Sequence, residues 1–318
     1  MTRYQALAVT TVGVTLVLIT IGAVVRTTGS GLGCPDWPLC HGQWLPPAER
    51  TAIIEYTHRT AAAIVGLFIV ATAAVALLRH RGDTVVRNLA VAAVVLLAVQ
   101  AWLGKETVER ELPPEIVTLH LGTALTLLAV LSVLTVFAFY GEQRRRIESR
   151  ERAAFVRLAT ITAAILLVIL LGGSYVVGSD STTACTTWPG CLQAPVPFVD
   201  GVLEQHIHWA HRLSTLVGLG AVGFVALSAT ELRGPLADRI QAGSMVLLGL
   251  YGLQMLVGAA NIWTTFSDVV RASHLALGAM IWAAAVLLVV AAAYEPGEAT
   301  EETEASRSVG DGREAARA

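Results

Sequence analysis

Histidines at recurring positions are the residues of this chain most suited to chemistry. Four of the eight share a place near the start of an apolar run: His58, His120, His211 and His274. EYTHR (55–59) and HWAHR (208–212) are 153 residues apart, and the other two histidines are 154 apart. Polar residues inside membrane spans are costly and point to function. Two imidazoles on facing helices can ligate a haem iron from both sides, so the pattern favours one haem site in each half.

A histidine taken singly is compatible with different roles. A lone imidazole in a span often forms hydrogen bonds between helices. Zinc needs three or four ligands, so Glu55 or His208 would have to join a pair. His208 shares a helix face with His211 and is a rival ligand. The absence of a C-x-x-C-H motif excludes covalently attached haem. Glycines that follow the histidines are expected to let helices approach the macrocycle: Gly66, Gly122, Gly218 and Gly278.

Glu55 distinguishes the two halves. It lies three residues before His58 on one helix face, and its repeat equivalent is His208. A carboxyl beside an apolar cavity can work as an acid or base, although a helix start also favours an interfacial glutamate. The difference indicates chemistry in the N-terminal half and a permanent cofactor in the C-terminal half. Arginines near the spans either extend to the interface or pair with haem propionates: Arg59, Arg212 and, best placed, Arg271.

Four cysteines form two C-x5-C pairs. Cys34 and Cys40 recur as Cys185 and Cys191 at an offset of 151 residues, and each loop contains Trp-Pro. We expect two disulfides, because both loops are predicted to face the oxidising outside. Free thiols remain an alternative, as does a redox-active pair.

The composition predicts the elements that must position these residues. Of 318 residues, 54% are hydrophobic and only 14% charged, and the net charge is −2. These values exclude a disordered chain, a nucleic-acid-binding protein and an ordinary cytosolic enzyme. Eight apolar runs are long enough to span a bilayer: 6–26, 54–78, 86–104, 116–140, 153–178, 207–229, 240–260 and 271–293. The fold class is therefore an all-α polytopic membrane protein.

Charge and repetition predict the topology. Arginines gather in the connections 79–87, 141–152 and 230–239, so these are expected in the cytoplasm together with both termini. The cysteine loops then lie outside the cell membrane. The repeat predicts two pseudo-symmetric four-helix bundles, 1–145 and 146–294, followed by a disordered cytoplasmic tail, 295–318.

Together these motifs resemble the haem A synthase family of bacteria with cytochrome aa3-type oxidases. The specific segments are RTTGSGLGCPDWPLCHG (26–42) and EYTHR, supported by HWAHR, the second cysteine pair and the spans opening at His120 and His274. The resemblance implies oxidation of a methyl group of haem O to a formyl group, which gives haem A for terminal oxidases. It implies substrate haem on His58 and His120, haem b on His211 and His274, and a catalytic Glu55. The first cysteine pair is associated with activity in the family and the second with structure.

The resemblance also implies partners and rivals. A haem O synthase, which is a farnesyltransferase, would supply the substrate, and a membrane electron-transfer partner would exchange electrons. The main alternative is a dihaem b-type electron-transfer cytochrome without catalysis, which leaves the presence of Glu55 in one half unexplained. A haem exporter or chaperone would need exchangeable haem in both halves.

Overall fold

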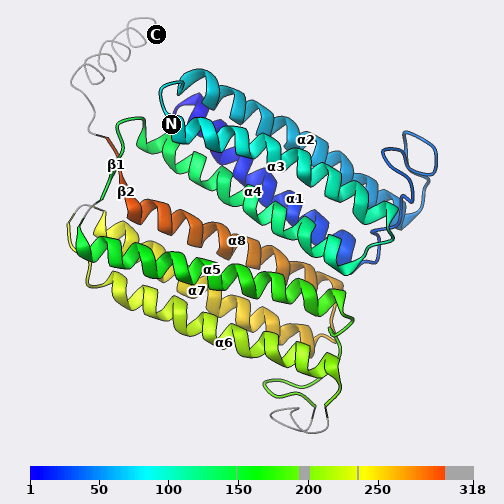
Figure 1. The fold of residues 1–318 in the computed structure, drawn as a ribbon. Coiled ribbons are helices and arrows are strands. Elements are labelled where there is room, and N and C mark those ends of the chain that lie inside the picture. The colour runs from blue at the N-terminus through cyan, green and yellow to red at the C-terminus, as the bar shows by residue number, and fades with distance from the viewer. Residues whose placement is uncertain (148, 193–200, 235, 298–318) are drawn as a thin grey trace, which may run out of the picture.

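The computed structural model describes residues 1–147, 149–192, 201–234 and 236–297. Eight long helices run nearly parallel or antiparallel through it (Figure 1). Their bounds are α1 Arg3–Thr27, α2 Arg50–Arg79, α3 Thr84–Glu109, α4 Pro114–Tyr140, α5 Arg150–Gly178, α6 Leu203–Ala229, α7 Ala237–Trp263 and α8 Asp268–Ala293. All eight are long and apolar enough to cross a bilayer, which confirms the predicted multi-pass, all-α membrane protein.

The helices extend beyond the apolar runs because polar residues continue or cap them. α3 runs five residues past the predicted end at 104, and the ion pairs Lys105–Glu109 (3.1 Å) and Arg110–Glu106 (2.7 Å) stabilise this last turn. At its start, the Asp83 side chain accepts hydrogen bonds from two backbone N–H groups of the first turn. Apolar periodicity alone does not detect such polar turns.

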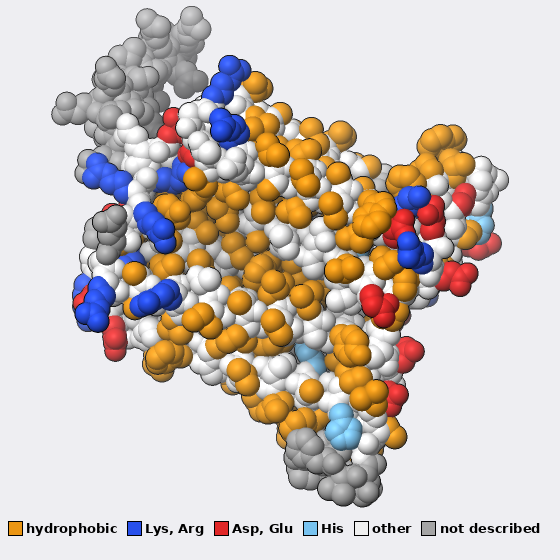
Figure 2. Space-filling model, viewed as in Figure 1, with side chains coloured by type: hydrophobic (Ala, Val, Ile, Leu, Met, Phe, Trp, Pro, Cys, Tyr) orange, Lys and Arg blue, Asp and Glu red, His pale blue; other side chains and the backbone are white. Residues whose placement is uncertain are grey.

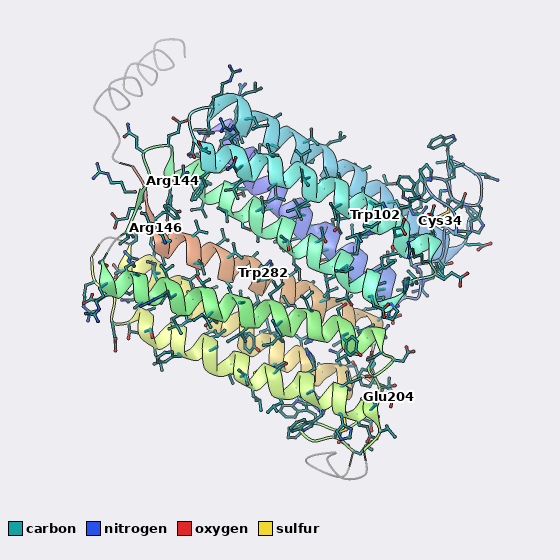
Figure 3. The ribbon with its side chains drawn as sticks, in the orientation of Figure 1. Cys34, Trp102, Arg144, Arg146, Glu204 and Trp282 are labelled. Atoms are coloured by element: carbon teal, nitrogen blue, oxygen red, sulfur yellow. A yellow bond between two sulfur atoms is a disulfide. The ribbon has the colours of Figure 1, made fainter. Side chains whose placement is uncertain are left out.

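The helices form two groups, α1–α4 and α5–α8 (Figure 1). Within each group consecutive helices pack together and the first helix contacts the fourth, so the second and fourth helices lie diagonally across the group. α8 also packs against α1 and α4, and α4 packs against α5. At this junction the buried Trp282 donates from Nε1 to the Leu125 carbonyl at 2.8 Å. Figure 3 shows Trp282 between the two groups.

The two ends of the molecule differ in charge. We call the end where α2, α4 and α6 finish the arginine-rich end, and the opposite end the cysteine-loop end. In Figure 2 most of the visible Lys and Arg side chains gather at the former, Asp and Glu dominate the latter, and apolar side chains cover the surface between. In Figure 3, Arg144 and Arg146 mark the first end, and Cys34 and Glu204 the second. An apolar belt between two polar ends is the surface that a bilayer requires.

A short two-stranded ribbon holds the segment that follows α8 against the helices. β1, Arg145–Arg146, pairs antiparallel with β2, Tyr294–Glu295, and the Gly297 N–H donates to the Tyr140 carbonyl. Glu295 is therefore tied to the helical body, whereas the predicted disordered tail begins at this residue. The rest of that tail, 298–318, lies outside the described residues.

Candidate functional site

The four candidate histidines lie at similar depth near the cysteine-loop end. Each follows the start of its even-numbered helix by six or eight residues, or about 9–12 Å along the axis. His58 on α2 lies near enough to His120 on α4 to interact with it electrostatically, and His211 on α6 bears the same relation to His274 on α8. The diagonal helices of each group thus hold two imidazoles at similar depth.

A buried Nδ1 without a partner distinguishes these four histidines from the other four. Each candidate ring carries a buried Nδ1 with no hydrogen-bond partner among the described residues. The other rings all bond through a nitrogen: His41 to the Gly33 carbonyl (3.0 Å), His80 to Glu142 (3.0 Å), His206 to the Val202 carbonyl (2.9 Å) and His208 to the Ser181 carbonyl (3.1 Å). Buried polar groups are normally paired. Four exceptions of one type at one depth make these rings the candidates for a ligand site.

A glycine on the preceding helix faces each candidate ring. The pairs are Gly22–His58, Gly104–His120, Gly173–His211 and Gly258–His274. The glycines expected from the sequence have other neighbours: Gly66 faces Leu97, Gly122 faces Leu171, Gly218 faces Tyr251 and Ile169, and Gly278 faces Leu170 and Gln254. These four serve helix packing. The glycines that face the rings lie on different helices from the histidines, so the spacing after each histidine does not reveal them, although their offsets of 151 and 154 residues match the repeat.

Two repeat-equivalent glutamines behave differently. Gln100 on α3 places its Nε2 at 3.1 Å from Nε2 of His120, the ring nitrogen that remains for a metal. Gln254 on α7 instead donates from Nε2 to the backbone carbonyl of His274 at 2.9 Å. In the N-terminal half, Gln100 is therefore hydrogen-bonded to a candidate ligand nitrogen. In the C-terminal half, the equivalent Gln254 bonds to the backbone.

Glu55 is buried and paired. Its carboxylate accepts a hydrogen bond from Arg59 Nε at 2.9 Å, and the residue is 5% exposed. The rest of the Arg59 guanidinium donates to the carbonyls of Asp36 (2.7 Å), Leu39 (2.9 Å) and Cys34 (2.7 Å). Arg59 thus clamps the first cysteine loop to α2 and is not free for the propionate role considered from the sequence.

In the second half of the chain, Arg212 holds the second cysteine loop as Arg59 holds the first, but the position of Glu55 is not occupied by a carboxylate. Arg212 donates to the carbonyls of Thr187 and Cys185, at 2.7 Å and 3.0 Å, and to that of Gly190. The position of Glu55 is taken by His208, which is 8% exposed. The propionate role is therefore also unsupported for Arg212.

Arg271 links the two groups of helices. Its Nη2 donates to the Thr27 carbonyl at the end of α1 and to Asp268 at 3.1 Å. Its Nε is buried without a partner among the described residues. One guanidinium N–H therefore stays available near His274, which lies three residues further along α8.

Both predicted disulfides are present, Cys34–Cys40 and Cys185–Cys191. In the first loop the Asp36 carboxylate accepts backbone N–H bonds from Gly42 (2.7 Å) and His41 (2.6 Å). These bonds, that of Gly42 first, hold the pKa of the Asp36 carboxyl below its usual value. The loop is therefore closed by a covalent bond, an Asp cap and the Arg59 clamp.

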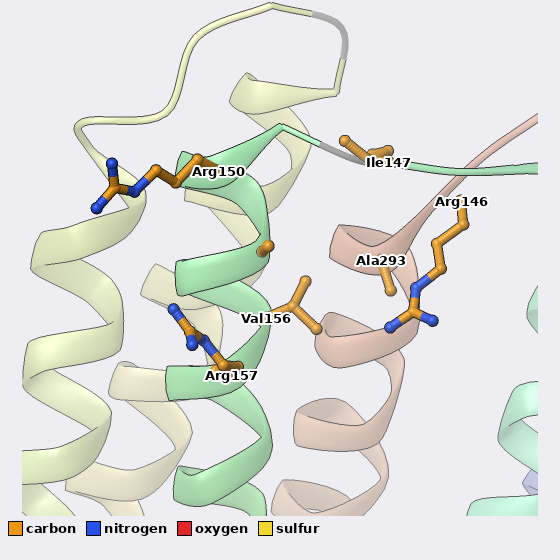
Figure 4. A pocket seen from close by; sticks show the side chains of 7 residues that line it. Arg146, Ile147, Arg150, Val156, Arg157 and Ala293 are labelled. Atoms are coloured by element: carbon orange, nitrogen blue, oxygen red, sulfur yellow. The ribbon is translucent and has the colours of Figure 1, made fainter.

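A cavity of about 310 Å³ opens at the arginine-rich end, away from the histidines. Arg146, Arg150 and Arg157 line it together with apolar side chains of α5 and α8. In Figure 4 the guanidinium groups of Arg150 and Arg157 lie on the far side of α5 from Arg146, so their charges do not meet at one point. The described residues also contain no group of three or more His, Cys, Asp and Glu arranged for a metal ion, which does not favour zinc.

The fold and these side chains define a multi-pass helical membrane protein with two cross-bundle histidine pairs. A family model described as cytochrome oxidase assembly protein (COX15-CtaA) matches residues 5–286, and the chain belongs to this family. Its relatives include proteins named heme A synthase. That of Exiguobacterium sp. is 33% identical, covering 78% of this chain and 79% of its own. That of Bacillus licheniformis is 30% identical, covering 80% and 84%, and that of Geobacillus kaustophilus is 32% identical, covering 83% of both.

Proposed function

We propose that this protein is a haem A synthase, a membrane oxidoreductase that converts a methyl group of haem O to a formyl group. The observation that carries the proposal is the set of four histidines at similar depth, two on the diagonal helices of each group and each with a buried, unpartnered Nδ1. Membership of the family and the names of the relatives support the same activity. The rival function, that of a plain electron-transfer cytochrome, has no such support.

The two pairs would hold different haems. His58 and His120 bind the iron of the substrate haem O, and His211 and His274 bind a resident haem b. When bound, haem b supplies one-electron transfer. The donor set fits because neutral imidazole is a good iron ligand and the four half-buried rings lie at similar depth, two in each group of helices. We prefer His211 to His208 as the ligand because His211 is the repeat equivalent of His58 and shares the unpartnered Nδ1 of the other three candidates.

Glu55 would be the catalytic acid or base of the N-terminal half. It lies three residues from His58, about one helical turn nearer the cysteine-loop end, and its buried carboxylate is held by Arg59. A carboxylate with a fixed position can accept and return protons as the substrate methyl group is oxidised. In the C-terminal half His208 occupies this position, so the carboxylate is specific to the N-terminal half.

The expected orientation follows from the arginine-rich end. Lys and Arg are retained on the cytoplasmic side, so both termini would be cytoplasmic and the two disulfide loops outside. Haem O carries a hydrophobic farnesyl chain and would enter from the bilayer after a haem O synthase has made it. Arg271 would bind a propionate of the haem in its half with its free Nε, and a membrane electron-transfer partner would receive electrons.

Expression in a host that makes haem O but no haem A tests the proposal. The wild-type chain should produce haem A on chromatography of the extracted pigments, and Glu55→Gln should retain haem O without producing formyl product. His208→Gln places the same amide at the equivalent position in the other half and should keep activity. If wild-type membranes contain haem B alone, the electron-carrier alternative holds. If Glu55→Gln makes haem A at the wild-type level, Glu55 has no catalytic role.

A further inference from the structure

The four glycines that face the histidines leave too little room for a side chain. A Cβ added at any of them would lie closer to the ring than an ordinary van der Waals contact. A Cβ built on Gly22 would lie 3.2 Å from His58 Cε1, and one on Gly173 would lie 3.1 Å from His211 Cε1. For both Gly104 and Gly258 the distance to Cε1 of the opposite ring is 3.3 Å. Carbon atoms in optimal contact are about 3.5–4.0 Å apart. Any larger residue would therefore push the ring from its present place.

These contacts are specific to the imidazoles. At all four positions the atoms nearest to the built Cβ belong to the ring of the opposing histidine. Glycines that serve close helix packing meet different atoms, as Gly66 does with Leu97. Other glycines on the same helices meet nothing within 4 Å, among them Gly13 on α1 and Gly172 on α5. Glycine content by itself therefore does not explain the pattern.

The unpartnered Nδ1 atoms explain why such contacts are needed. A histidine that binds a metal usually donates its second ring nitrogen to a carbonyl or carboxylate, and that bond sets the ring orientation. All four candidate Nδ1 atoms lack this bond among the described residues. Contact with the neighbouring helix is then what remains to limit rotation of the ring about its side-chain torsions.

We propose that Gly22, Gly104, Gly173 and Gly258 are positioning residues for the haem ligands. Because each glycine lacks a Cβ, the Cε1 edge of one imidazole can pack against it. This contact sets the rotation of the ring and therefore the direction of the ligating nitrogen. The proposal rests on the proposed function, in which these histidines bind haem.

Adjacent residues on α5 provide a matched test. Gly173 meets His211, whereas the neighbouring Gly172 has nothing within 4 Å. Gly173→Ala and Gly173→Val are purified as full-length protein beside Gly172→Ala and Gly172→Val. Haem b per chain is measured by pyridine haemochrome, and the low-spin electron paramagnetic resonance signal reports the ring orientations. Size-exclusion profiles and the number of free thiols check that each variant is folded.

The expected results form a graded series. Gly173→Ala should retain haem with shifted resonance positions, Gly173→Val should lose at least about tenfold in haem occupancy, and both Gly172 variants should match wild type. If Gly173→Val is unfolded, the Gly173→Ala spectrum decides alone. Unchanged haem content and spectra in the folded Gly173 variants would overturn the inference.

A further variant separates this inference from the proposed function. His211→Ala should lose haem b. If His211→Ala keeps its haem, the assignment of the ligands is wrong, and the proposed function fails with it. If His211→Ala loses haem while Gly173→Val binds it normally, only the role of the glycines is wrong.

Discussion

Removal of the Arg59 side chain should loosen the first cysteine loop. This guanidinium makes four hydrogen bonds, one to Glu55 and three to the loop carbonyls of Cys34, Asp36 and Leu39. Its side chain is 15% exposed and that of Glu55 is 7% exposed, so both charges are largely withdrawn from solvent. In Arg59→Ala the loop loses these three hydrogen bonds, and the Glu55 carboxylate stays buried without its partner.

The size of the effect follows from that burial. Loss of one partner of a buried ion pair costs about 3–5 kcal/mol. Because the Arg59 side chain retains some exposure, we expect the cost of its removal to lie at the lower end of this range, about 3 kcal/mol. Each 1.4 kcal/mol is a factor of ten, so local opening of the loop should become about 100-fold more frequent.

Hydrogen exchange of the loop amides is the assay. Mass spectrometry of peptides that cover residues 34–43 in detergent-solubilised protein should show exchange about 100-fold faster in Arg59→Ala. Arg212→Ala is the matched control, because Arg212 binds its own loop but has no carboxylate partner among the described residues. Exchange in residues 185–192 should rise by a smaller factor there, since no charge is left buried.

A double variant tests the contribution of the buried charge. Glu55→Gln in the Arg59→Ala background removes the unpaired carboxylate and should recover about tenfold of the lost protection, since an unsatisfied buried charge costs about 1–3 kcal/mol or more. Exchange within twofold of wild type in Arg59→Ala would refute the clamp. No recovery in the double variant would show that the ion pair is energetically irrelevant.

Further predictions concern other parts of the fold. Gln100→Ala removes the amide bonded to His120 Nε2 and should tighten haem binding by the N-terminal half about two- to tenfold, as measured by haem titration, because that bond no longer competes with iron. The Arg144 guanidinium holds the pKa of Asp83 below its usual value, so the pair stabilises the fold above about pH 4 and this stability is lost as the pH falls. The unfolding temperature of Asp83→Asn should therefore be lower than that of wild type at pH 7, with a difference that shrinks on acidification; a constant difference contradicts this. Trp282→Phe should destabilise the α4–α8 junction by about 0.6 kcal/mol in steric-trap or denaturant measurements, and an unchanged value would show that its hydrogen bond is not used.

Much of the architecture could be predicted from the sequence because a bilayer imposes local rules. A span must be a continuous apolar segment, and its length is set by the membrane thickness. The eight runs and their connections therefore follow from the order of apolar and polar residues along the chain. The cysteine pairs were also predictable, since five intervening residues keep Cys34 near Cys40 in any compact loop.

Contacts between helices were decided only by the tertiary structure. Gly22 and His58 are 36 residues apart, and their contact depends on how α1 and α2 are rotated against each other. That rotation is set by the packing of every neighbouring helix, which no local pattern records. The position of Arg59 in EYTHR suggested a propionate ligand, and only the folded loop shows its guanidinium on three carbonyls. Sequence determined which residues reach the cysteine-loop end of the membrane, and packing decided which atoms they meet there.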